Sequence, residues 1–332
     1  MAQTGVTIEV SAPPTLPGGG GLVDTLRRVG LVVEYVNADD PTAPDVDGLS
    51  AEQRAGSAPV GDGRWWETRD SVAAVARSQS RPVGCGDLVD WVDCGHGGDY
   101  TSKATSEQPS TTTQEGWDVV ADDACSTFSV RYEERVDRAV TNLVRKQSNS
   151  VAAELWRGTL AQEQSWDSLY LAGAAVQVTA PGSPLPLSYA LGALQEALGG
   201  CLGDGQAGII HASRTTVTAW LRDGTVLWDS DRGVLVDVFG NVVVASGAYD
   251  GSDPDGVTTD GVPWVYATGP VVVRLGPVRL ISPAADWLGS VERQNNDLTV
   301  RAERTVNYQF DGCCVFAAAV DICNACCEPG GS

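Results

Sequence analysis

Lysine and histidine are nearly absent from this chain of 332 residues. Its only lysines are Lys103 and Lys146, and its only histidines are His96 and His211. With 43 acidic residues against 22 basic ones, the formal net charge is −21. Broad binding to a nucleic acid backbone needs clustered lysine and arginine. The composition therefore argues against sequence-independent wrapping of DNA by this chain.

Long apolar runs are missing too. No stretch approaches about 18 uninterrupted apolar residues, so we expect no transmembrane helix. Residues 1–10 have neither the basic start nor the apolar run of a signal peptide. We therefore expect synthesis in the cytoplasm, where the nine cysteines start out reduced. Since nine is an odd number, they cannot all pair within one chain.

The first third of the chain lacks the pattern of a packed domain. Residues 1–59 are rich in Gly, Pro, Ala and Asp, which predicts a flexible arm. Within this arm, residues 22–29 predict a short helix and residues 31–36 a strand. Because the arm has little surface to bury against itself, we expect neighbouring subunits to support it. Residues 64–110 are irregular and predict a long loop.

Apolar periodicity becomes clear in the remainder of the chain. A strand is predicted over 117–130, and the longest helix over 132–162, with Val140, Leu143 and Val151 on its apolar face. A bend is predicted at 148–150, and Gly158 weakens the helix end. A helix over 187–198 is predicted to stop at Gly199 and Gly200. Further elements are predicted at the strand 209–210, the helix 215–221 after an N-cap at Ser213, and the strands 234–239, 242–245, 264–268, 271–275, 278–281, 298–302, 306–310 and 315–322.

Six short motifs resemble one protein family. They are Glu154-Leu155-Trp156-Arg157-Gly158, Gly208-Ile209-Ile210-His211-Ala212, Phe239-Gly240-Asn241-Val242-Val243-Val244, Trp264-Val265-Tyr266-Ala267-Thr268-Gly269, Val273-Arg274-Leu275-Gly276 and Val300-Arg301-Ala302-Glu303-Arg304. These motifs, and the order of arm, long loop, long helix, mixed domain and terminal strands, resemble tailed-phage major capsid proteins of the Hong Kong 97 fold. The similarity is to structural proteins of phages infecting actinobacteria.

The resemblance implies an α+β fold in five parts. These are an N-terminal arm (1–60), an extended loop region (61–115), a peripheral domain with a spine helix (116–180), an axial domain (181–290) and return strands of the peripheral domain with a C-terminal tail (291–332). It also implies hexamers and pentamers that close into an icosahedral head around double-stranded DNA. The expected location is the virion capsid, after assembly in the host cytoplasm.

The resemblance also implies which partners the chain has. They are other copies of itself, scaffolding and portal proteins, decoration proteins as a further option, and weakly contacted packaged DNA. No membrane, cofactor or catalytic residue is implied. Because the chain starts at Met1 with a short arm, we expect a separate scaffolding protein. The alternatives are an encapsulin-type compartment subunit, another structural protein of the virion, or a cysteine- or zinc-dependent enzyme. The enzyme would need a pocket that joins His96 or His211 to a cysteine and a carboxylate.

The cysteines form the strongest cluster of site-like residues. Cys323, Cys326 and Cys327 lie close together near the chain's end, with Cys313 and Cys314 upstream. Structural zinc needs about four Cys or His ligands, and Cys85 and Cys94 could supply the second pair. The metal-ligand candidates are therefore Cys85, Cys94, Cys323 and Cys326, and the disulfide candidates are these four with Cys327. Free or buried thiols are the other interpretation.

Three further groups have weaker patterns. Lys103 lies in the predicted loop, and some Hong Kong 97 capsids join a loop lysine to an asparagine on a neighbour. The resemblance therefore makes Lys103 a cross-link candidate, while the simpler interpretation is a solvated lysine. Its possible partners by location are Asn295, Asn296 and Asn307. His211 follows an apolar strand and is expected to be a hydrogen-bonded core or interface residue. The acidic stretch 249–256 lacks the closing Glu of a calcium loop and predicts an exposed turn.

Overall fold

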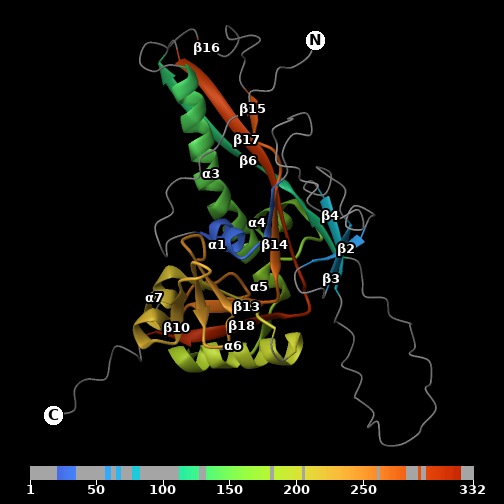
Figure 1. Cartoon of the computed structure of the whole chain (residues 1–332), viewed down its shortest axis with the longest axis vertical. Helices are drawn as coiled ribbons and strands as arrows, with labels where there is room; N and C mark the ends of the chain where they lie inside the picture. The colour runs from blue at the N-terminus through green and yellow to red at the C-terminus, as the bar shows by residue number, and fades with distance from the viewer. Residues whose placement is uncertain are drawn as a thin grey trace, which may run out of the picture.

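The computed structural model describes residues 21–34, 57–60, 65–68, 77–82, 112–126, 132–179, 183–203, 206–259, 262–281, 291–292 and 297–322. Within these ranges, no helix is long and apolar enough to cross a membrane. In Figure 1 a long helix and a ribbon of long strands rise from a compact body that is lined at its base by a second helix. The molecule is therefore elongated.

The helices have the following bounds. They are α1 (Leu22–Arg28), α3 (Tyr132–Arg157), α4 (Thr159–Gln164), α5 (Leu171–Ala174), α6 (Leu187–Leu202) and α7 (Arg214–Asp223). The helix predicted over 215–221 is confirmed as α7, and the Oγ of Ser213 accepts a hydrogen bond from Thr216 N at 3.3 Å as its N-cap.

The described strands form three sheets. The six-stranded sheet contains β1 (Val32–Glu34), β6 (Trp117–Ser126), β14 (Val271–Leu275), β15 (Arg279–Ile281), β16 (Val291–Glu292) and β17 (Asp297–Phe310). The eight-stranded sheet contains β7 (Val176–Gln177), β8 (Leu185–Pro186), β9 (Ile209–Ser213), β10 (Val226–Asp229), β11 (Val234–Asp237), β12 (Val242–Ser246), β13 (Trp264–Thr268) and β18 (Val315–Asp321). The four-stranded sheet contains β2 (Ser57–Val60), β3 (Trp65–Thr68), β4 (Arg77–Pro82) and β5 (Thr112–Glu115).

A first hydrophobic core lies between α3 and the six-stranded sheet. Val140, Leu143 and Val151 of α3 are at most 3% exposed, so the predicted apolar face of this helix is confirmed. Alternate residues of β17 line the same core, because successive side chains of a strand point to opposite faces. Figure 1 shows α3 running alongside the ribbon of β6 and β17. This layer forms the long axis of the molecule.

The other face of the β6–β17 ribbon is polar, and it is exposed around Arg301 but buried at Asn307 and Gln309. Arg301 donates two hydrogen bonds to the carboxylate of Asp122, at 2.7 and 3.0 Å. Thr305 Oγ1 donates to Asp118 Oδ1 at 2.6 Å. Hydrogen bonding to Arg301 lowers the pKa of Asp122. One face of the ribbon therefore lines the core, and the other face carries paired polar groups around Arg301 and Thr305.

The central strands of the eight-stranded sheet are buried on both faces, whereas the edge strands β7 and β10 have exposed residues. Ile209 and Val244 face the first core, whereas Ile210 and Val243 face a second core that α6 and α7 cover. Strands buried on both faces are apolar at every position rather than at alternate ones. This is why β12, β13 and β18 appear in the sequence as continuous apolar runs. The compact body thus consists of one sheet shared by two cores.

Residues 22–34 differ from the expectation of an arm held by neighbours. Leu22, Val23 and Leu26 of α1 are at most 1% exposed and belong to the first core of their own chain. β1 pairs in parallel with β14. The prediction of an arm without self-burying surface was wrong for this segment, because seven helical residues place their few apolar side chains on one face. The rest of range 1–60 lies outside the described residues, except for β2.

Several predicted element boundaries were wrong as well, including the end of the long helix, which was predicted at 162 and lies at Arg157. α6 continues through Gly199 and Gly200, because Leu198 and Leu202 both bury in the second core and this offsets a glycine cost of about 1 kcal/mol each. The two strands expected over 298–310 are a single strand, β17. Arg304 holds a core-facing position in its middle, where its Nη1 donates to Gln147 Oε1 of α3 at 3.2 Å. In addition, α3 is continuous across the predicted bend and ends before Gly158.

Sheet membership crosses the predicted domain ranges. β14 and β15 lie within the range predicted for the axial domain, yet they pair with β17 in the six-stranded sheet. β18 lies within the range predicted for the return strands, yet it pairs with β13 in the eight-stranded sheet. The range 61–115, predicted as an irregular loop, contributes three of the strands of the four-stranded sheet. The division into five parts remains a prediction.

Candidate functional site at the junction of the two sheets

The chain crosses between its two large sheets at two adjacent places. It leaves the eight-stranded sheet after Thr268, at the end of β13, and enters the six-stranded sheet at Val271. It returns between Phe310, at the end of β17, and Val315, at the start of β18. Gly269 N donates to the backbone oxygen of Cys314 at 3.3 Å. The two crossovers are therefore hydrogen-bonded to each other.

A buried histidine supports the first crossover. His211 of β9 is fully buried, with Nδ1 3.0 Å from the Tyr249 hydroxyl and Nε2 3.0 Å from Thr268 Oγ1. Thr268 Oγ1 donates its own proton to Gly269 O at 2.7 Å, so it accepts from Nε2–H. Nδ1 then accepts from the Tyr249 hydroxyl. Burial lowers the pKa of His211 from 6.5 to about 3, so a neutral imidazole fits this site.

The end of α3 is anchored at the same junction by Trp156. Its ring stacks on Tyr249 and meets the edge of Tyr266, with centroid distances of 4.6 Å in both cases. Its Nε1 donates to Ser252 Oγ at 3.0 Å, and the Tyr266 hydroxyl donates to Ser252 O at 3.2 Å. Offset and edge-to-face aromatic pairs add about 0.5–1.5 kcal/mol beyond burial. Trp156 therefore ties the long helix to the compact body.

Glu154 and Arg157 complete the attachment of α3. The Glu154 carboxylate accepts from Leu160 N at 2.8 Å and Ala161 N at 2.9 Å, which caps the first turn of α4. Burial raises the pKa of Glu154, and the two backbone donors oppose that shift. Arg157 forms an ion pair with Asp250, in the stretch predicted as an exposed acidic turn. The motif 154–158, one of the six motifs that resemble capsid proteins, is therefore the segment that joins α3 to its surroundings.

His211 makes the stability of the protein dependent on pH. Its pKa is about 3 when folded and near 6.5 when unfolded, so the unfolded chain binds the extra proton between these values. We expect the unfolding free energy to decrease as pH falls below 6.5, by up to about 1.4 kcal/mol per pH unit from this group. His211→Gln should remove that component, whereas His96→Gln should retain it. Equal pH slopes for wild type and His211→Gln, measured by urea unfolding, would contradict this assignment.

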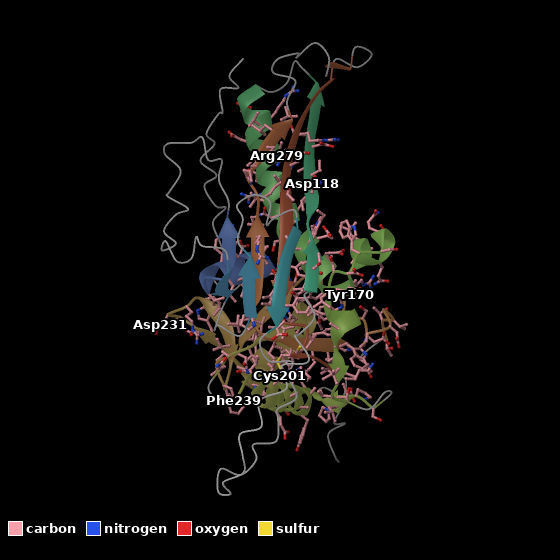
Figure 2. All side chains as sticks on the ribbon, turned by 90° about the vertical axis from the view of Figure 1, so that its right-hand side faces the viewer. Asp118, Tyr170, Cys201, Asp231, Phe239 and Arg279 are labelled. Atoms are coloured by element: carbon pink, nitrogen blue, oxygen red, sulfur yellow. A yellow bond between two sulfur atoms is a disulfide. The ribbon has the colours of Figure 1, made fainter. Side chains whose placement is uncertain are left out.

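A rigid turn on the compact body presents two exposed apolar side chains. Val238 is 66% exposed and Phe239 is 73% exposed. The neighbouring Asp237 is buried, and its carboxylate accepts from Phe239 N, from Asn241 N and Nδ2, and from Gln195 Nε2, at distances between 2.7 and 2.9 Å. Figure 2 places Phe239 on the same side of the molecule as Asp231 and on the opposite side from Tyr170. The turn is pre-organised to present Phe239 outward.

Most of the sites predicted from sequence lie outside the described residues. These are Cys85, Cys94, His96, Lys103, Asn295, Asn296, Cys323, Cys326 and Cys327. Asn307 is described and fully buried, and its Nδ2 donates to Gln114 O at 3.1 Å. His211 is the hydrogen-bonded core residue that the sequence predicts. Among the described residues, no group of three or more His, Cys, Asp or Glu side chains is placed to hold a metal ion.

Sequence reasoning missed the disulfide between Cys201 and Cys314. The Cα atoms of these residues are 5.8 Å apart, and 113 positions separate them in the sequence. Cys313 is disulfide-bonded as well. The vicinal pair Cys313 and Cys314 was noted as part of a cluster, but nothing local marks Cys201 as a partner. The only usable signal was the predicted helix end at 199–200, which places Cys201 near a turn.

The fold and the junction define the class of protein: an elongated α+β chain in which a long helix and strand layer is anchored to a compact body. A search of protein-family models finds no match, and a search of curated proteins finds none. Among solved structures, the chain is similar to one described as the capsid of an empty GTA particle. The two share 14% identity with a TM-score of 0.45, over 94% of this chain and 95% of that chain.

Two further solved structures are similar to this chain. One is from Microbacterium phage Oxtober96, with 12% identity and a TM-score of 0.42 over 95% of each chain. The other is the holo-SrpI encapsulin complex from Synechococcus elongatus, with 12% identity and a TM-score of 0.43 over 86% of this chain and 92% of that chain.

Proposed function

We propose that this chain is the major capsid protein of a tailed phage. Copies of it form hexamers and pentamers that close into an icosahedral head around double-stranded DNA. Scaffolding and portal proteins assist assembly in the host cytoplasm, and the product is the virion shell. The role of the chain is structural rather than catalytic, and its contacts with packaged DNA are weak, in keeping with its net charge of −21.

The observation that supports this proposal most directly is the anchoring of the long α3 layer to the compact body. Trp156, Glu154 and Arg157 hold the helix end at the junction through stacking, capping and an ion pair. A rigid, elongated subunit exposes much surface for its volume, and it holds distant surface patches in a constant relative orientation. A repeated contact between such subunits generates a closed ring when the rotation from one subunit to the next closes, and a constant orientation of the patches keeps that rotation the same at every contact.

Electron microscopy of the purified chain tests the proposal directly. We expect negative-stain images to show closed, roughly spherical shells or the rings from which they form. A compact monomer at all concentrations would contradict a shell-forming role. DNA content separates the phage head from an encapsulin-type compartment: heads filled in the presence of the packaging machinery should hold nuclease-protected double-stranded DNA, whereas a compartment should hold protein cargo.

The Phe239 turn is expected to contribute to assembly rather than to folding. Phe239 is 73% exposed, so Phe239→Ser should change the unfolding free energy by no more than about 0.5 kcal/mol. The same change should reduce the yield of shells, because exposed aromatic side chains on rigid turns are favoured at interfaces. Val257→Ser is the matched control, since Val257 is a second exposed apolar residue at 56%. Equal yields from both variants would show that the turn has no part in assembly.

A further inference from the structure

The Cys201–Cys314 disulfide joins a weak helix end to the junction of the two sheets. Cys201 lies in the last turn of α6, directly after Gly199 and Gly200. Glycine inside a helix costs about 1 kcal/mol relative to alanine. Among the described residues, no atom outside the backbone of α6 lies within 4 Å of where a Cβ would stand at either position. These glycines are therefore not required by close packing, and they weaken the turn. The disulfide holds this turn in place.

The other end of the disulfide lies where the chain crosses between sheets. Cys314 directly precedes β18, and its backbone oxygen accepts the hydrogen bond from Gly269 N on the other crossover. Asp311 Oδ1 accepts from Cys313 N at 2.9 Å and shapes the same turn. The Leu202 side chain, one residue after Cys201, lies 3.3 Å from where a Cβ of Gly269 would stand. The helix end and both crossovers thus meet at one place.

We propose that the Cys201–Cys314 disulfide is a redox-controlled lock between the end of α6 and the turn that joins β17 to β18. When both residues are thiols, the last turn of α6 frays and the crossovers gain freedom. When they are joined, α6 is fixed to the turn through which β17 leads into β18. The lock itself is a property of the single chain. Its use in assembly rests on the proposed function: subunits assemble with free thiols and are locked in the finished shell.

A low-molecular-weight disulfide such as glutathione disulfide is the oxidant of the closing step. Cys201 is half-buried and Cys314 is 4% exposed, so Cys201 is the thiol that the oxidant reaches first. Its thiolate attacks the small disulfide, forms a mixed disulfide and releases one small thiol. Cys314, as a thiolate, then attacks the Cys201 sulfur and releases the second small thiol. Two protein thiols lose two protons and two electrons, and one small disulfide becomes two small thiols.

Amide hydrogen exchange on the unassembled full chain tests the lock. Samples in glutathione disulfide and in dithiothreitol are compared, with the redox state verified by alkylation and intact mass. We expect the amides of Cys201 to Gly203, and that of Gly269, to exchange at least about tenfold faster after reduction. The amides of α3 around Leu143 serve as the internal control and should be unchanged. Equal exchange at the end of α6 in both states would overturn the proposal.

A double-mutant cycle separates the disulfide from side-chain packing and from the second disulfide at Cys313. Under oxidising conditions Cys201→Ser, Cys314→Ala and the double variant should all show the same faster exchange at the end of α6, because each breaks one bond. Each should match reduced wild type at this site. If the increases in exchange caused by the two single changes add up in the double variant, then each residue acts through its own packing. That result would contradict the lock.

Shells provide the second arm of the test. Wild-type shells assembled with dithiothreitol and then oxidised should resist dissociation to higher urea concentrations than reduced shells, and Cys201→Ser shells should not respond to oxidation. Resistance unaffected by oxidation would overturn the proposed use in assembly. A chain that forms no shells but shows the exchange difference would refute the proposed function and leave the lock intact. The two ideas therefore fail in distinguishable ways.

Discussion

Replacing Trp156 by alanine is expected to destabilise the protein by about 3–5 kcal/mol. The side chain is fully buried, stacks on Tyr249, meets Tyr266 edge to face, and donates a hydrogen bond to Ser252. Alanine would leave a cavity at the junction of both sheets and an unpaired Ser252 hydroxyl. The measurement is urea unfolding, monitored by the circular dichroism of the backbone rather than by tryptophan fluorescence. The same variant should also assemble poorly, since the end of α3 loses its anchor.

Trp228 provides a matched control of the same residue type. It lies on the edge strand β10 and is 39% exposed. Trp228→Ala should therefore lower the unfolding free energy by well under half as much as Trp156→Ala. Trp156→Phe keeps most of the ring area and removes the donor to Ser252. Its unfolding free energy should lie between those of wild type and Trp156→Ala. If Trp156→Ala and Trp228→Ala cost the same, then Trp156 is not the anchor of the junction.

Leu143→Ala is the second change with a large expected effect. Leu143 is fully buried in the middle of α3 against the six-stranded sheet. Truncation of a buried leucine costs about 2–5 kcal/mol through lost transfer energy and the cavity left behind. We expect a matching fall in unfolding free energy by denaturant titration, and less soluble subunit. Helix propensity does not oppose the change, since alanine favours helix.

Leu221→Ala is the control for that experiment. Leu221 is also a helical leucine, near the end of α7, but it is 42% exposed. Its truncation should cost about 1 kcal/mol or less, because little area is returned to water and no closed cavity forms. A cost at Leu143 as small as that at Leu221 would refute the placement of α3 on the sheet.

Helices and their buried faces were largely predictable. Spacing of apolar residues at three and four positions identified α3, α6 and α7, and an N-cap serine located the start of α7. Errors came where burial outweighed local preference. Burial of Leu202 stabilises α6 beyond its two glycines. A hydrogen bond to Gln147 stabilises Arg304 at a core position inside one long strand. The length of α6 and the continuity of β17 both depend on contacts between segments that are distant in sequence.

The candidate site was predictable only in part. The apolar residues before His211 indicated a core histidine, but its partners Tyr249 and Thr268 lie 38 and 57 positions away. The motif 154–158 was noticed as a pattern, whereas the stacking of Trp156 on Tyr249 was not foreseen. The partner of Cys201 could not be chosen among the other eight of the nine cysteines, because cysteine spacing does not determine connectivity.

Most helices and strands, the excess of acidic residues and the general α+β character of this protein could be derived from its sequence. These properties follow from side-chain chemistry and from periods of a few residues. The folded structure was needed to show which sheet each strand joins, that α1 buries in its own chain, and that two crossovers, a tryptophan and a disulfide meet at one junction. The physical reason is that strand pairing, cavity filling and cross-linking depend on distances in space, and identical local patterns satisfy several such arrangements until the whole chain packs.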